Sequence, residues 1–195
     1  MRQLVLASTS PYRRKLLEQL QLDFIVARPL FEESIDQGLA PALLVKHLAL
    51  EKARSLVTVF PDALIIGSDQ VFVDAQGQTL GKPGNLEQAF SQLRQMAGRT
   101  HTFHTGLAVV DSRDGSLRSD AVTFSVTFRS LTDEQILNYL RREQPFDCAG
   151  SFKIEGLGIA LMESMAGEDY NALIGLPLIK LVSLLERMGV SVLNE

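Results

Sequence analysis

The stretch "LVLASTSPYRRKLL", residues 4–17, contains the signals that predict how the chain begins to fold. Its apolar residues 4–7 predict a buried strand. Ser10 is a favourable helix N-cap, Pro11 suits the first helical position, and leucines then return at helical spacing. The stretch therefore predicts a strand, a turn and a helix.

The rest of the chain alternates between further predicted strands and helices. β-branched and apolar runs predict strands at 24–27, 63–73, 102–110, 121–128 and 159–162, with a break at 67–69 left open. Helical periodicity predicts helices at 41–59, 86–96, 132–142 and 177–188, with Thr132 as an N-cap and Gly98 as a C-terminal cap. The two strands around "SRDGS" are expected to form a hairpin. With no repeat and no linker, this pattern predicts one mixed α/β domain over residues 1–195, with its site beyond strand ends.

Composition limits the classes of function. The 195 residues are 46% hydrophobic, which is enough for a sizeable core, and the net charge of -4 argues against a general nucleic-acid binder. A single cysteine excludes an internal disulfide, and no apolar run is long enough to span a membrane. We expect a soluble cytoplasmic protein with no membrane or nucleic-acid partner. The sequence leaves open whether two copies form a homodimer.

The opening stretch has the features of an anion site. Free N–H groups at the helix start, the hydroxyls of Ser8 and Ser10, and the charges of Arg13 and Arg14 all favour phosphate. The alternative is an ordinary capped helix with solvated arginines. Capping explains one serine and the proline, but positive charge in the first turn opposes the helix dipole. We therefore favour a negatively charged ligand.

Two charged residues fall in apolar surroundings, and each has two interpretations. Asp69 interrupts the apolar run "IIGSDQV", where a buried carboxylate must be paired, bind metal or accept a proton, although a turn aspartate is an equal alternative. Lys52 borders the apolar stripe of the long helix. Such a lysine usually extends to water, but it could instead direct its ammonium into a site.

Loop residues complete the set of candidates. Lys82 in "GKP" and Lys153 and Glu155 in "CAGSFKIEGLG" could contact phosphate or simply belong to surface turns, and no Walker phosphate loop is present. Glu32 and Glu33 could hold magnesium together with Asp69, although an acidic pair in a loop is usually solvated. Several cations with a few carboxylates fit metal-assisted hydrolysis of a phosphoanhydride better than acyl or hydride transfer.

Taken in order, these motifs resemble the Maf family of nucleoside triphosphate pyrophosphatases. The segments that carry the resemblance are "LASTSPYRRKLL", "FEES", "LALEKA", "IIGSDQV", "GKP", "TGLAVV", "CAGSFKIEGLG" and "DYNALIGLP", and they cover nearly the whole chain. The resemblance implies a mixed, twisted sheet with flanking helices and a central nucleotide cleft, as in Maf and ITPase-like folds. It also implies a divalent cation, magnesium or manganese, and hydrolysis of a nucleoside triphosphate to a monophosphate and pyrophosphate.

The resemblance also implies roles for individual residues. Asp69 corresponds to the proton acceptor that activates water, and Glu33 to the loop carboxylate that shares the metal with it. The positions on the phosphate side are Ser8, Arg13, Lys52 and Lys82.

Three further positions indicate the subgroup of the family that acts on 7-methyl-GTP. They are Tyr12, Gln70 and Glu155, where the subgroup acting on dTTP and UTP usually has arginine, threonine and glutamine. N7-methylation makes guanine cationic, so an aromatic face can stack on it and a carboxylate can balance its charge. Tyr12 departs mildly from the tryptophan that is common there. Two alternatives stay open: a nucleotide-binding regulator of cell division or septum formation, and a house-cleaning pyrophosphatase with broad specificity for modified nucleotides.

Overall fold

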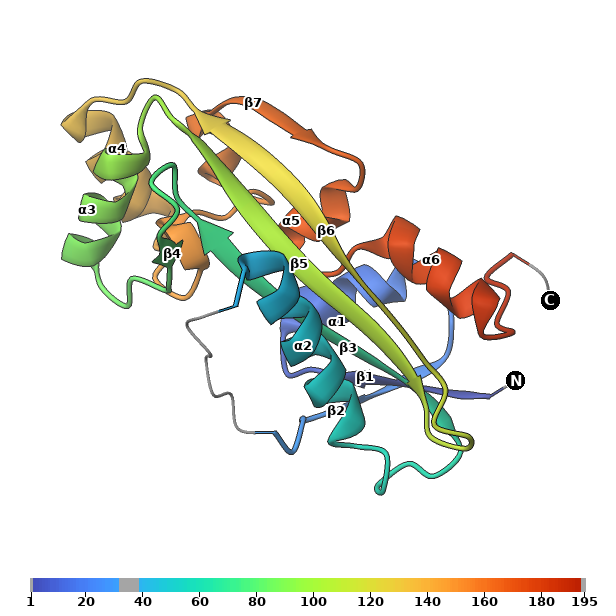
Figure 1. Cartoon of the computed structure of the whole chain (residues 1–195). Helices are drawn as coiled ribbons and strands as arrows, with labels where there is room; N and C mark the ends of the chain where they lie inside the picture. The colour runs from blue at the N-terminus through green and yellow to red at the C-terminus, as the bar shows by residue number, and fades with distance from the viewer. Residues whose placement is uncertain (1, 32–38, 194–195) are drawn as a thin grey trace. The chain divides into compact units, whose positions relative to one another are not determined.

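The computed structural model describes residues 2–31 and 39–193, so Glu32 and Glu33 lie outside the described residues. None of the described helices is long and apolar enough to cross a membrane. Along the chain (Figure 1) the elements are β1 Gln3–Ala7, α1 Pro11–Glu18, β2 Phe24–Ala27, α2 Pro41–Arg54, β3 Ala63–Val73, β4 Thr79–Leu80, α3 Leu86–Met96, β5 Thr100–Asp111, β6 Leu117–Phe128, α4 Asp133–Glu143, η1 Ala149–Ser151, η2 Leu157–Leu161, β7 Met162–Gly167, α5 Tyr170–Ile174 and α6 Leu178–Arg187.

The strands form a mixed sheet in the order β2-β1-β3-β5-β6-β7, and β4 pairs with β3. β1 is parallel to both of its neighbours, and Ala7 is aligned with Ala27 of β2 and Gly67 of β3. β4 pairs antiparallel with β3 in the middle of the order, and β7 pairs antiparallel with β6 at its other end. This seven-stranded sheet with flanking helices confirms the predicted mixed α/β class.

The chain divides into two compact units. The first contains Met1–Gln70, His104–Thr123 and Asp169–Glu195, and the second contains Val71–Phe103 and Phe124–Glu168. Because β3, β5 and β6 each contribute residues to both, the boundary falls within strands and not in a linker.

In the first unit, the opening stretch folds as its local chemistry predicts. Ser10 has extended backbone angles, and its hydroxyl oxygen accepts a hydrogen bond from the Arg13 N–H at 3.4 Å. Pro11 occupies the first position of α1, where its missing N–H costs nothing. The strand, the N-cap and the helix start are therefore all confirmed.

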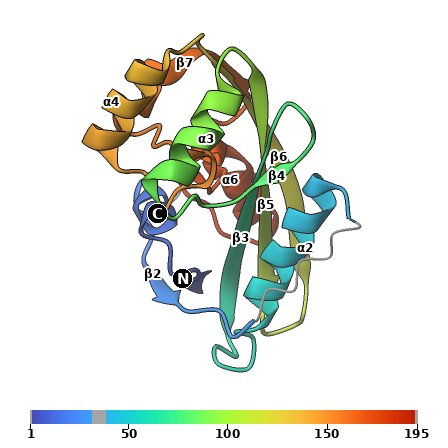
Figure 2. The ribbon, with the colours of Figure 1, turned by 90° about the vertical axis from the view of Figure 1, so that its left-hand side faces the viewer.

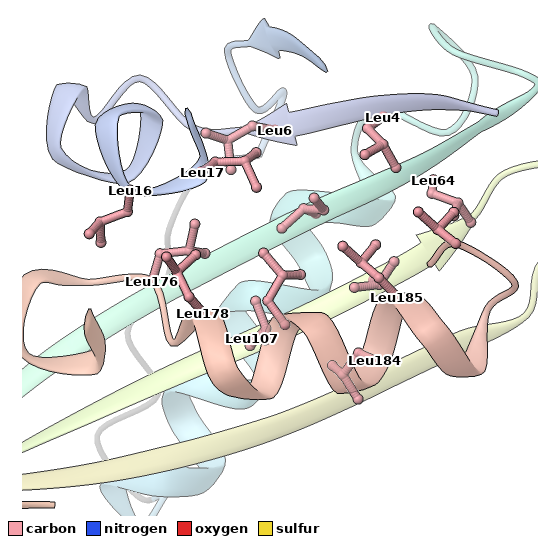
Figure 3. Close-up of a cluster of buried hydrophobic side chains, with 14 residues drawn as sticks. Leu4, Leu6, Leu16, Leu17, Leu64, Leu107, Leu176, Leu178, Leu184 and Leu185 are labelled. Atoms are coloured by element: carbon pink, nitrogen blue, oxygen red, sulfur yellow. The ribbon is translucent and has the colours of Figure 1, made fainter. Parts of the chain in front are cut away.

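The first unit has a core on each face of β1, because successive residues of a strand point to opposite sides. Leu4 and Leu6 pack in a leucine-rich cluster with residues of α1, β3, β5 and α6 (Figure 3). Val5 and Ala7 pack on the other face against Ala53 of α2 and its neighbours. Burial on both faces explains the unbroken apolar run at the start of the chain.

Helix α2 lies beside the sheet (Figure 2), and two glycines of the sheet allow it to approach closely. A Cβ added at Gly67 would lie 2.0 Å from the carbonyl oxygen of Ala49, and one added at Gly106 would lie 2.0 Å from that of Val45. Only glycine leaves room for helix backbone at these two points. The spacing of α2 from β3 therefore depends on Gly67, and its spacing from β5 depends on Gly106.

The second unit is built around aromatic side chains. Phe72, Phe103, Phe128 and Phe152 contact one another at ring-centroid distances of 4.4 to 6.1 Å. Helix α4 begins with the predicted Thr132 cap, which forms a full capping box with the third helical residue. Gly98 follows α3 with a positive φ of 70°, in agreement with its predicted capping role.

Strands β5 and β6 are neighbours in the sheet, so the predicted hairpin is confirmed. Its turn is closed by hydrogen bonds from the Asp111 N–H to the Ser116 carbonyl at 2.8 Å and from the Gly115 N–H to the Asp111 carbonyl at 2.9 Å. The 63–73 segment forms one continuous strand, so the break left open at 67–69 does not occur.

Several predicted boundaries are wrong. Strand β6 begins at Leu117 and not at residue 121. Helix α2 ends at Arg54 and not at residue 59, because the Ser55 hydroxyl donates to the Lys52 carbonyl at 2.8 Å and the chain continues in three-residue turns. The strand predicted at 159–162 is instead the short helix η2 followed by β7. Five of the six residues of β7 are exposed, so it lacks the apolar signal that would have located it.

A bidentate ion pair ties the start of β1 to the end of β5. Both Nη atoms of Arg2 donate to the carboxylate of Asp111, which is 6% exposed. Arg2 also approaches Asp62, and Arg113 donates to Asp62 at 2.8 Å. The hydrogen bond from Arg2 is the main cause that lowers the pKa of Asp111 from 3.8 to about 2.

This pair should make folding stability depend on pH in acid. Because the pKa of Asp111 is lower in the folded chain, its stabilisation is fully present above about pH 4 and is lost as the pH falls from about 4 to about 2. We expect it to amount to about 1 to 2 kcal/mol after solvent screening. Urea unfolding of the wild type and Asp111→Asn at several pH values measures it: the difference between them should shrink below pH 4, and a constant difference would contradict the assignment.

Candidate active site

The most conspicuous polar contact in the first unit is a buried ion pair between α2 and β3. The ammonium of Lys52 donates to Oδ1 of Asp69, and both residues are 8% exposed. Asp69 lies within a continuous strand and Lys52 one turn after Ala49, at the close approach of α2. The turn interpretation of Asp69 and the solvated interpretation of Lys52 are therefore both wrong.

Ser8 lies at the carboxyl end of β1, near the same point of the sheet. It follows Ala7, whose partner in β3 is Gly67, so the register places Ser8 within two residues of the level of Asp69. The Ser8 side chain is buried, and its hydroxyl oxygen accepts the Ser10 N–H at 3.1 Å. A hydroxyl that accepts this bond retains a hydrogen that it can donate to an anion.

Arg13 and Tyr12 occupy the first turn of α1, and both are half-buried. Nε of Arg13 donates to the carbonyl oxygen of Gly175 at 2.9 Å, which orients its guanidinium plane. The guanidinium of Arg13, in the first turn of α1, is thus hydrogen-bonded to the backbone that follows α5. Arg14, by contrast, is exposed and pairs with Glu18 one turn along α1 at 2.9 Å.

Gln70 is held on the opposite face of β3 from Asp69. Its Nε2 lies 2.7 Å from the carbonyl of Ala172 and 2.9 Å from the hydroxyl of Thr105. Thr105 in turn donates to the same Ala172 carbonyl at 2.8 Å. These bonds fix Gln70 against α5, so the residue expected to select the base also positions a helix.

Sequence reasoning missed the segment that these side chains hold. Helix α5 has only five residues, too few for a periodic signal. Its N-cap Asp169 accepts the N–H groups of Asn171 at 2.9 Å and Ile179 at 2.8 Å, so it joins the starts of α5 and α6. Buried Ser68 lies 2.9 Å from the carbonyl of Gly175. The cap spacing in "DYNALIGLP" is the one signal that could have indicated this helix.

Two predicted site residues belong to the second unit. Lys82 is exposed in the loop between β4 and α3, next to buried Pro83. Glu155 is exposed in the turn before η2, and neighbouring Lys153 lies 3.6 Å from Asp147. In the first unit the structure brings Lys52 and Asp69 into contact, and it brings Arg13 and Gln70 to the segment around α5.

The described residues offer few ligands for a divalent cation. No group of three or more acidic, histidine or cysteine side chains suited to a metal occurs in residues 2–31 and 39–193. Asp69 is a hard oxygen ligand, and magnesium is commonly held by one or two carboxylates together with substrate phosphates. The residues present therefore fit a cation that arrives with a polyphosphate, and they do not form a complete metal cage.

A lysine and an aspartate buried together beside a capped helix start can bind an anionic group and accept a proton next to it. These features define an α/β protein with a candidate site for a phosphorylated small molecule. A protein-family model described as Maf-like protein matches residues 3–188. The chain belongs to the Maf family.

Several curated proteins are similar to this chain over its full length. The 7-methyl-GTP pyrophosphatase of Syntrophotalea carbinolica is 60% identical over all of this chain and 99% of its own, and that of Polaromonas is 53% identical over all of this chain and 88% of its own. Among solved structures, the Staphylococcus aureus Ham1 protein covers 80% of this chain and 89% of its own at a TM-score of 0.47 and 13% identity, too distant a likeness to bear on function.

Proposed function

We propose that this protein hydrolyses 7-methyl-GTP to 7-methyl-GMP and pyrophosphate. The observation that carries the proposal is the 60% identity, over the full length, to a protein named 7-methyl-GTP pyrophosphatase. The buried Lys52 and Asp69 pair supports the reaction class, because it supplies a cation for phosphate and a carboxylate for water at one place.

In the proposed reaction Asp69 takes a proton from a water molecule as that water attacks the α-phosphorus. The bond between this phosphorus and the α–β bridging oxygen breaks, and pyrophosphate leaves. Lys52, Ser8, Arg13 and Lys82 bind the phosphates by charge and hydrogen bonds. In the free protein the ammonium of Lys52 donates a hydrogen bond to Asp69. A triphosphate that attracts the ammonium would release the carboxylate for water. A magnesium or manganese ion bound with the triphosphate, held by Asp69 and Glu33, would supply charge neutralisation.

Selection of the base is assigned to Tyr12, Gln70 and Glu155. Stacking on Tyr12 and the negative charge of Glu155 both favour the cationic ring of 7-methylguanine over a neutral base. A panel of 7-methyl-GTP, GTP, dTTP and UTP, with magnesium or manganese and pyrophosphate release as the readout, tests this. We expect the highest kcat/KM for 7-methyl-GTP, and turnover of dTTP or UTP without turnover of 7-methyl-GTP would refute the proposed substrate.

Glu155→Gln separates charge recognition from a structural role. The substitution keeps the size of the side chain and removes its charge, so we expect kcat/KM for 7-methyl-GTP to fall about tenfold while that for GTP changes little. Glu163→Gln, which removes another exposed glutamate from β7 of the same unit, should leave both values unchanged. An equal loss for both nucleotides in Glu155→Gln would assign position 155 a structural role.

A further inference from the structure

The loop that carries Glu155 is closed on itself. Residues 154–156 form a turn with Glu155 at its centre, between Lys153 and η2. The carbonyl oxygen of Lys153 accepts the N–H of Gly156 at 3.3 Å and that of Gly158 at 2.9 Å. A side chain at Gly158 would meet this carbonyl at 2.2 Å. Glu155 therefore projects from a tight loop and not from an extended strand.

Two side chains of α4 hold this loop on either side of Glu155. The hydroxyl oxygen of Tyr139 accepts the N–H of Lys153 at 3.0 Å, and Oε2 of Glu143 accepts the N–H of Leu157 at 2.7 Å. The two residues are four apart and so lie on one face of α4. The backbone is thus fixed two residues before and two residues after Glu155.

The contact between α4 and the loop is close. A Cβ at Gly156 would lie 2.7 Å from Oε1 of Glu143, so the loop backbone lies directly on that carboxylate. Tyr139 is 4% exposed, and burial is the main cause that raises the pKa of its hydroxyl. The hydroxyl therefore stays neutral and hydrogen-bonded at physiological pH. The capping box fixes the start of α4 itself.

We propose that Tyr139 and Glu143 are positioning residues that hold Glu155 where it recognises the cationic base. This inference rests on the proposed function, because the role of Glu155 in recognising the base is part of that proposal. Neither side chain needs to touch the substrate. Each restricts the conformations of the loop in the free protein, so less conformational entropy is lost at Glu155 when the nucleotide binds. The two α4 residues thus determine selectivity for the methylated base and leave the hydrolytic step unchanged.

The test measures kcat/KM for 7-methyl-GTP and for GTP in the full-length protein. Tyr139→Phe removes one acceptor without changing charge, and Glu143→Ala removes the other. We expect each to lower the ratio of the two kcat/KM values about five- to tenfold, mainly through KM for 7-methyl-GTP, with kcat for GTP unchanged. Thermal unfolding of each variant shows that the assays compare folded proteins.

Two controls separate positioning from other effects. Glu143→Gln keeps an oxygen that accepts the Leu157 N–H but removes the charge, so it should retain the wild-type ratio. If Glu143→Gln instead matched Glu143→Ala, charge at a distance would explain the effect and positioning would be overturned. Arg142→Ala changes an adjacent exposed residue of α4 and should leave the ratio unchanged.

The outcome also distinguishes this inference from the proposed function. If Glu155→Gln lowers the ratio but Tyr139→Phe and Glu143→Ala do not, the proposed function stands and the positioning role is refuted. If Glu155→Gln leaves the ratio unchanged, the role of Glu155 in base selection fails first. An equal loss for both nucleotides in folded α4 variants would also refute positioning, because the effect would not depend on the base.

Discussion

Asp69→Asn should lower kcat for 7-methyl-GTP by about 10²- to 10⁴-fold, the range that a positioned general base contributes. Asparagine keeps the shape of the side chain but cannot accept the proton of the attacking water, and it is a poorer ligand for a divalent cation. Nucleotide binding, measured by calorimetry, should stay detectable because Lys52, Ser8 and Arg13 are unchanged. Full activity in this variant would remove Asp69 as the proton acceptor.

The substitution also breaks a buried ion pair, so loss of stability must be separated from loss of chemistry. Removing the Asp69 carboxylate breaks its ion pair with buried Lys52, and breaking a buried ion pair typically costs about 3 to 5 kcal/mol. Asp111→Asn is the matched control, since it removes another buried, ion-paired carboxylate from the same unit. It should lower the free energy of unfolding and leave kcat unchanged. A comparable loss of kcat in the control would assign the effect of Asp69→Asn to folding.

Local chemistry is what the sequence predicts well in this chain. Ser10, Pro11 and Thr132 act through neighbours within four residues, so their capping roles follow from residue type and spacing alone. Strand β1 is equally easy to predict, because burial on both faces makes its residues 4–7 all apolar. The exposed strand β7 and the five-residue α5 carry no such pattern, and both were missed or misplaced.

The long-range contacts of the site could not be predicted from residues alone. Lys52 and Asp69 each had a solvated alternative, and the choice depends on how closely α2 packs on β3, which no local pattern encodes. Gln70 shows the same limit. Its resemblance to a specificity position was visible in the sequence, but its bonds to Thr105 and Ala172 join residues 35 and 102 positions away.

The close packing of α2 leads to the second large expected effect, that of Gly67→Ala. The new Cβ would lie 2.0 Å from the carbonyl oxygen of Ala49, a separation that real Cβ atoms do not show. Because the obstacle is helix backbone and not a flexible side chain, α2 must move by about 1 Å or more. We expect the free energy of unfolding to fall by about 2 to 3 kcal/mol or more, as in other overpacked cores.

That movement should also disable the site, because Lys52 lies on α2 one turn beyond Ala49. Misplacing a catalytic group by about 1 Å can cost about 10²-fold in rate, so kcat/KM should fall by that order even in protein that is still folded. Gly106→Ala, which meets the Val45 carbonyl at the same distance, should behave alike. Gly81→Ala is the control for stability: apart from its chain neighbours, no residue lies within 4 Å of its added Cβ, so its unfolding should match that of the wild type. A Gly67→Ala protein with unchanged stability and kcat/KM would show that the approach of α2 does not determine where Lys52 meets Asp69.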